Sequence, residues 1–292
     1  MIRNKTNFLL FGQILLGLFF SNPEYLLAQR TDSISYNNRK ICYWGSYGLG
    51  YATGMYLLYQ AWYKDYKHSD FHWFDDRFEW CQMDKAGHAF SSFHLAKASF
   101  NGLKWVGYTD QKARVWSSVS SFFTISSIEL YDAYSAKWGA SFSDLIANAA
   151  GSALFYVQNT SQRSPINLKF SFHTSTYAAQ RPDALGKYRY EQILKDYNGQ
   201  TYWLSLNLHD CGIEKIPKWL NLALGYSAER MINGTGNSPY RQYFLSLDFN
   251  AESIKTKNKW IKTILKTFNL IKFPFPAVEF SQHKFTGHGI YF

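Results

Sequence analysis

The side chains best suited to proton transfer or metal binding are concentrated between residues 84 and 151 of the 292-residue chain. They stand among small or apolar residues, and burying an isolated charge in such surroundings is costly. These groups must therefore be paired, hydrated or functional. The set comprises Asp84, Lys85, His88, Glu129, Asp132, Ser143, Asp144 and Asn148.

Three of these residues are the candidates for catalysis. His88 is suited to acid–base chemistry because an imidazole exchanges protons near neutral pH, and Glu129 and Asp144 are carboxylates that could assist it. The same three groups could bind a metal, although the chain has no recognised ligand spacing. The motifs therefore predict no metal site and no cofactor. No Ser or Cys nucleophile lies in a known motif, and no glycine-rich phosphate loop is present.

Four helices are expected to position these side chains. Asp84 is predicted to begin one of them, where a carboxylate can cap backbone N–H groups, and His88 falls four residues later on the same face. The segment Ser141–Asp144 matches a capping box that begins another helix. The predicted helices are 41–63, one that starts at Asp84 and includes Ser99, one from about 111 to 134, and one that follows the capping box and runs to about Val157. Residues 64–83, which include Asp76, are predicted to form a solvated loop or a short helix that packs its aromatic residues.

Glu129 and Asp132 are placed near the C-terminal end of the helix predicted at 111–134. A carboxylate at that end opposes the helix dipole. We therefore expect a compensating cation there, from Lys85, His88 or Lys137. The Ser- and Ala-rich faces of these helices should allow close approach, so that the candidate residues converge.

The segment Ile41–Tyr63 carries no charged residue over 23 positions. That length can span a bilayer. The segment is rich in Gly and Tyr rather than in Leu and Ile, so a buried core helix is an equal alternative. The sequence leaves both interpretations open.

The pattern after Pro165 changes from a helical period to alternation, which predicts an antiparallel β region. One amphipathic helix, at 251–270, interrupts it with five lysines on one side and Trp and Phe on the other. Such a helix can lie in a membrane interface or pack on the sheet. The predicted strands are 166–173, 201–208, 219–227, 240–249, 276–282 and 287–292, the last two joined by a turn. The predicted class is α+β, with a helical domain at 29–163 and a β-rich domain at 164–292.

Residues 1–28 resemble a secretory signal. A charged start, a 13-residue apolar run from Phe8 to Phe20 and a cleavage position after Ala28 support this. No Cys follows that position, so a lipid anchor is not expected. The chain carries 31 Lys and Arg against 21 Asp and Glu, and an exported basic protein is expected to meet acidic lipids rather than nucleic acid. We predict an envelope location, in the periplasm or outer membrane.

The region 84–151 resembles the YfiM-like family of uncharacterised envelope proteins. The likeness is carried by Asp84-Lys85, His88, Glu129, Asp132, the segment 135–138, Ser143-Asp144, Ala147-Asn148 and Gly151. A looser likeness to VanZ-like membrane proteins rests on the order Asp-Lys-x-x-His, Glu, Ser-x-Asp and Asn-x-x-Gly. The whole chain is similar to the long form of the YfiM-like group. The resemblance implies an envelope location and no established activity.

Three functions remain open from the sequence. The first is a non-enzymatic envelope protein, membrane-associated, whose polar cluster ties the helices together. The second is a membrane-proximal hydrolase or transferase acting on a lipid- or glycan-linked substrate, with His88 as acid and base. The third is a metal-binding module that uses His88 with Glu129 or Asp144. Protein partners are not predicted.

Overall fold

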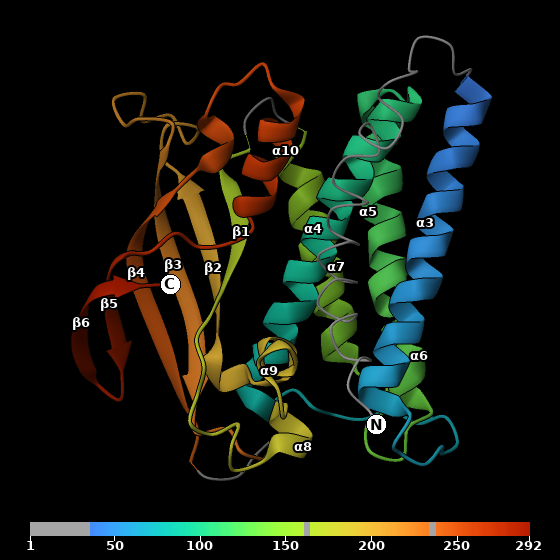
Figure 1. Ribbon diagram of the computed structural model, residues 1–292, viewed down its shortest axis with the longest axis vertical. Helices are drawn as coiled ribbons and strands as arrows, with labels where there is room; N and C mark the ends of the chain where they lie inside the picture. The colour runs from blue at the N-terminus through green and yellow to red at the C-terminus, as the bar shows by residue number, and fades with distance from the viewer. Residues whose placement is uncertain (1–35, 161–163, 234–237) are drawn as a thin grey trace, which may run out of the picture. The chain divides into compact units, whose positions relative to one another are not determined.

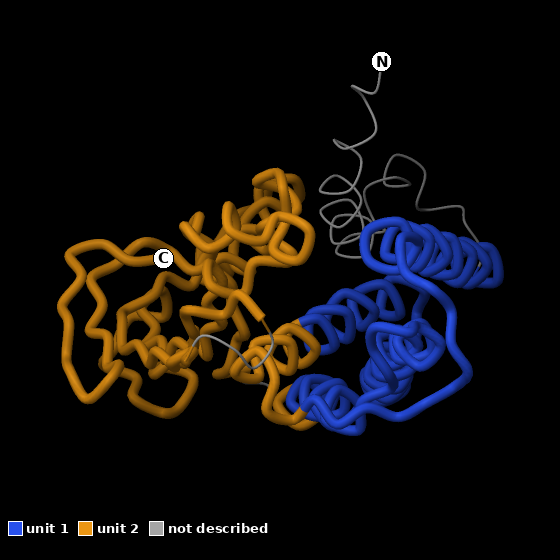
Figure 2. The backbone as a smooth tube through the Cα atoms, turned by 90° about the horizontal axis from the view of Figure 1, so that it is seen from below, with its two compact units in different colours: residues 1–76, 91–156 blue, residues 77–90, 157–292 orange. Residues whose placement is uncertain are grey.

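The computed structural model describes residues 36–160, 164–233 and 238–292, so the predicted signal segment lies outside the described residues. The chain has the predicted α+β class: helices precede a six-stranded antiparallel sheet (Figure 1). It divides into two compact units, residues 1–76 with 91–156 and residues 77–90 with 157–292 (Figure 2). The division passes through one continuous helix, α4 (Met83–Val106).

Five helices of the described chain precede the sheet. Three of them pack through small side chains: the Ser92 hydroxyl on α4 donates to the carbonyl of Asn148 on α7 at 2.8 Å and lies 2.6 Å from the Ser152 hydroxyl. The Ser121 hydroxyl on α5 donates to the Ser92 carbonyl at 2.5 Å. Small residues thus allow these helices to approach closely, as predicted. The bounds are α3 Tyr36–Leu58, α4 Met83–Val106, α5 Asp110–Ser126, α6 Ile128–Ala133 and α7 Phe142–Gln158.

Helix α3 is already helical at Tyr36, five residues before the predicted start, and continues into one π-helical stretch, Tyr59–Tyr63. It buries Tyr43 and Tyr47, and the Tyr47 hydroxyl bonds the Thr124 hydroxyl of α5 at 2.7 Å. Among the residues that the structure describes, no helix combines the length and the apolarity needed to cross a membrane.

The single helix predicted at 111–134 is wrong, because α5 ends at Ser126 and α6 begins at Ile128. The Ser127 hydroxyl donates to the Thr124 carbonyl at 2.7 Å. Such a local bond competes with the helical pattern and bends helices. Glu129 therefore lies in the first turn of α6. The helix dipole stabilises a carboxylate in the first turn, whereas the sequence predicted that the dipole would destabilise Glu129.

The sheet has the order β1-β2-β3-β4-β5-β6, and all its pairs are antiparallel. Six strands at these positions confirm the alternation pattern. The turn before the last strand is tighter than predicted, because Gln282 and His283 alone make it and adopt positive φ angles. The bounds are β1 Ile166–Phe172, β2 Gln200–Asn207, β3 Leu220–Glu229, β4 Tyr240–Phe249, β5 Phe275–Ser281 and β6 Lys284–Tyr291.

The buried face of the sheet is the polar one. Along β4, Gln242, Ser246 and Asp248 are buried, whereas Tyr243, Leu245 and Leu247 between them are about half exposed. An aromatic group, Trp203 with Phe244 and Tyr291, completes the buried face. An ion pair of Lys169 with Asp248, 2.7 Å apart, is also fully buried there.

The helices in the second unit differ from the prediction. The amphipathic helix α10 covers only Lys259–Phe268, because the Asn258 side chain caps the N–H groups of Trp260 and Ile261 and ends the preceding turn. Two short helices, α8 Pro182–Leu185 and α9 Arg189–Lys195, lie between β1 and β2 and were not expected.

Residues 77–90 belong to the same unit as the sheet. Trp80, Cys81 and Gln82 have φ angles of 47°, 48° and 61°, in the left-handed region that costs non-glycine residues energy. The sheet holds them there, since the Tyr226 hydroxyl donates to the Cys81 carbonyl at 2.5 Å and Arg241 donates to the Gln82 side chain at 2.7 Å. Helix α4 starts directly after this turn.

Candidate functional site

The N-terminus of α7 is capped in an unusual way. The Asp144 N–H donates to the Ser141 hydroxyl at 3.2 Å, which is one half of the predicted capping box. The other half comes from α6, because the Ser141 N–H donates to Glu129 Oε2 at 2.9 Å. The Asp144 carboxylate is therefore not needed for the second cap bond.

Asp76 joins this group from the connection before α4. Its Oδ1 accepts hydrogen bonds from the hydroxyls of Ser141, at 2.6 Å, and Ser143, at 2.8 Å. The two hydroxyls are 2.8 Å apart. A solvated connection was the wrong interpretation for Asp76, which is partly buried and tied to the start of α7.

Asn148 lies one turn beyond Asp144 and is completely buried. Its amide donates to the Ser126 hydroxyl at 3.3 Å, and its carbonyl accepts the Ser92 hydroxyl. These bonds hold α7 against the end of α5 and against α4.

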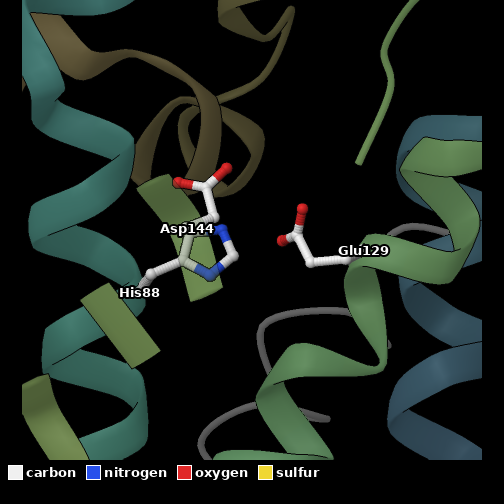
Figure 3. Close-up of side chains that lie close together, drawn as sticks. All are labelled: His88, Glu129 and Asp144. Carbon is white, nitrogen blue, oxygen red and sulfur yellow. The ribbon is translucent and has the colours of Figure 1, made fainter. Parts of the chain in front are cut away.

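His88, Glu129 and Asp144 each offer one ligand atom, and these three atoms lie within 4.8 Å of one another. Figure 3 shows the three side chains pointing toward a common space, from α4, α6 and α7. His88 occupies the second turn of α4, which continues without a break into the helical unit. Oxygens of Asp76, Asp84 and Asp144 form a second such group, also within 4.8 Å.

Burial governs the electrostatics of the site. Glu129 is only 4% exposed and Asp144 only 6%. Burial raises the pKa of Glu129 to about 8, the Ser141 N–H bond partly opposes this, and the nearby carboxylates of Asp144, Asp132 and Asp76 add to it. Glu129 therefore carries a proton for most of the time at neutral pH.

The other predicted residues have different partners. The Lys85 ammonium pairs with Asp84 at 2.7 Å. Asp132 accepts the Tyr63 hydroxyl at 2.9 Å. Lys137 donates to the Tyr66 hydroxyl and lies over the Tyr66 ring, so it does not supply the cation expected beside Glu129.

The sequence did not predict that Asp76 belongs to the site. It also did not predict that the Ser141 N–H binds Glu129. No sequence pattern singled out Asp76, because the charged and aromatic residues around it follow neither a helical nor a strand periodicity. Ser141 was recognised as a cap residue. Its backbone bond to Glu129 joins two elements, and no local pattern encodes such a bond.

Residues 70–160 match the model of a family, DUF2279, described as a predicted periplasmic lipoprotein. The match covers the candidate site and confirms an exported protein of the cell envelope. No curated protein and no solved structure shows significant similarity to the chain. Membrane association is what a lipoprotein description suggests.

Proposed function

We propose that this envelope protein holds a divalent cation among His88, Glu129 and Asp144, and that the cation ties α4, α6 and α7 together. The proposal combines two functions that the sequence left open, a structural polar cluster and a metal-binding module. The observation that carries it is the approach of the three ligand atoms to within 4.8 Å.

The charge of the site supports a cation. Glu129 and Asp144 are buried, and oxygens of Asp76 and Asp84 also come close to Asp144. Carboxylates this close cannot all be ionised unless positive charge compensates them, and the Lys85 ammonium, 2.7 Å from Asp84, supplies part of that charge. A bound divalent ion would add to it and take the place of the proton on Glu129.

The donor set indicates which ions to test. Zn²⁺ and Mn²⁺ are suited to one imidazole nitrogen together with carboxylate oxygens. A site made of oxygens alone would instead favour Mg²⁺ or Ca²⁺. The Ser141 N–H would orient the ligand Glu129, and the hydroxyls of Ser141 and Ser143 hold Asp76, an oxygen of which lies close to the ligand Asp144. Such outer bonds fix the geometry of metal ligands.

The residues that carry the likeness to YfiM-like and VanZ-like proteins include Asp84, His88, Glu129 and Asp144. We propose that these proteins share the site. The shared motif would then be a set of cation ligands and their supports, and the remaining residues, such as Asn148, would position the helices.

Calorimetric titration of the mature chain, first treated with EDTA and dialysed, tests the proposal. We expect saturable binding of Zn²⁺ or Mn²⁺ at one ion per chain, weakened at least about tenfold by Glu129→Gln, which removes a charged ligand of the same shape. Glu214→Gln, which changes an exposed glutamate in the second unit, is the matched control and should bind as the wild type. A wild-type protein that binds neither ion would leave the cluster as a purely structural network.

A second candidate function is acid–base catalysis on a lipid- or glycan-linked substrate. The observation that favours it is the pKa of Glu129, about 8, close to His88. A carboxyl group that titrates near neutral pH can act as a general acid or base. Envelope lipid and cell-wall profiles of a deletion strain and of a His88→Ala strain test it, since a catalytic role requires both strains to accumulate the same compound.

A further inference from the structure

Helix α10 leaves its apolar side exposed within the second unit. Four of its large apolar residues are exposed by 45% to 64%, and the residue that it buries most deeply is Thr263. On a helix of 3.6 residues per turn, these four residues share one side and Thr263 lies outside it. They are Trp260, Ile261, Ile264 and Phe268.

The orientation is fixed from both ends by bonds within the second unit. Before the helix, the Ala251 N–H donates to the Asn269 side chain at 3.1 Å, and the Asn269 amide donates to Glu252 at 2.9 Å. After the helix, the Phe170 N–H of β1 donates to the Leu270 carbonyl at 2.9 Å, and the Lys272 N–H donates to the Phe170 carbonyl at 3.0 Å. Turning the apolar side inward would break these bonds.

The lysines of α10 lie on the side of the helix opposite its exposed apolar residues. Lys259 and Lys262 on the helix, and Lys255 and Lys257 just before it, are all exposed. Between residues 251 and 268, Glu252 is the one acidic residue, and it accepts the Asn269 amide. The segment therefore carries an apolar side and, on the opposite side of the helix and just before it, a concentrated positive charge.

We propose that α10 binds the surface of an anionic lipid bilayer, with Ile261, Ile264 and Phe268 entering the boundary between headgroups and acyl chains. An amphipathic helix with large apolar residues on one side and lysines on its polar side is suited to this position. The positive charge complements anionic headgroups, and the envelope location places such a surface within reach. This inference does not depend on the cation site.

Co-sedimentation of the mature chain with vesicles tests the inference. We expect binding to vesicles of phosphatidylcholine with phosphatidylglycerol, and binding at least about tenfold weaker to phosphatidylcholine alone, because several lysines each contribute to attraction by acidic lipid. Equal binding to the two kinds of vesicle, or binding to neither, would overturn the proposal.

Two pairs of variants locate the contact. Ile261→Ser with Ile264→Ser should reduce binding at least about tenfold, since both side chains would leave the apolar boundary. The matched control changes two equally accessible isoleucines of the same unit, Ile213→Ser with Ile290→Ser, and should bind as the wild type. All four positions are exposed, so both variants should keep the wild-type unfolding midpoint.

The second pair tests the charge. Lys259→Gln with Lys262→Gln should weaken binding to the anionic vesicles, whereas Lys215→Gln with Lys284→Gln, also at exposed positions, should not. If the α10 variants bind vesicles as the wild type does, the proposal is wrong. A wild type that self-associates through α10, with dimers lost in the Ile261 and Ile264 variant and no vesicle binding, would assign the surface to a second copy of the chain instead.

Discussion

The Ser141 N–H donates to the Glu129 carboxyl group across 12 residues of sequence, at 2.9 Å. This bond joins the first turn of α6 to the cap of α7. It also explains why Glu129 remains in a buried place that raises its pKa, since the carboxyl group satisfies a backbone donor that would otherwise be buried without a partner.

Glu129→Ala should therefore destabilise the protein by about 1–3 kcal/mol when metal is removed with EDTA, the cost of leaving a buried donor unpaired. Glu129→Gln should retain most of the stability, because an amide oxygen can still accept the Ser141 N–H and the neutral amide resembles the protonated acid. Urea unfolding at pH 7 measures both. Equal losses in the two variants would show that the bond contributes nothing.

Ser92→Ala should cost about 1 kcal/mol, because it removes the hydroxyl that bonds the Asn148 carbonyl and the Ser152 hydroxyl. Ser92→Leu should cost more, about 1–3 kcal/mol or above, since it overfills the narrow contact of three helices. Ser91→Ala changes the exposed neighbour and should leave the urea midpoint unchanged. A Leu variant as stable as the wild type would mean that the helices are not closely packed there.

Gly225 on β3 lies against buried aromatic rings. A Cβ atom at this position would come 2.7 Å from the Trp203 ring and 3.0 Å from the Phe244 Cβ. Trp203 is 1% exposed and cannot move aside easily, so Gly225→Ala should cost about 1–3 kcal/mol. Gly287→Ala on β6, where no atom lies within 4 Å of a new Cβ, is the strand control. Equal thermal unfolding midpoints for the two variants would contradict the close packing of Gly225 against Trp203 and Phe244.

Lys272 is buried, and burial lowers its pKa to about 8, with Asp248 opposing and Lys169 adding to the shift. Between pH 8 and 10.5 the unfolded chain binds more protons at this site than the folded chain, so the site's contribution to stability rises with pH. Below pH 8 both states are protonated and the buried charge has its full cost.

Lys272→Met should therefore gain stability relative to the wild type at pH 7, and about 2 kcal/mol of that gain should be lost by pH 9.5, as a shift of this size requires. Urea unfolding at the two pH values measures the difference. Lys284→Met, at an exposed position, should show no such change. A difference between Lys272→Met and the wild type that is the same at both pH values would refute the assigned direction.

Local signals in the sequence were sufficient for most elements. The capping box at Ser141–Asp144 located the start of α7 because a cap is made by residues three apart. Alternation located the six strands because side chains on a strand change face at every residue. The same signals placed His88, Glu129 and Asp144 on helices whose small residues allow close contact.

Only the tertiary structure decided which partners the site residues meet and which face of each helix is buried. The break at Ser127 moved Glu129 from the end of one helix to the start of another, and its partner, the Ser141 N–H, lies on a different element. The period of residues 259–268 determined which side chains share a face of α10. Contacts at Asn269 and Phe170 decided that this face points outward. A periodic pattern specifies faces and not directions, because direction depends on bonds between residues far apart in the chain.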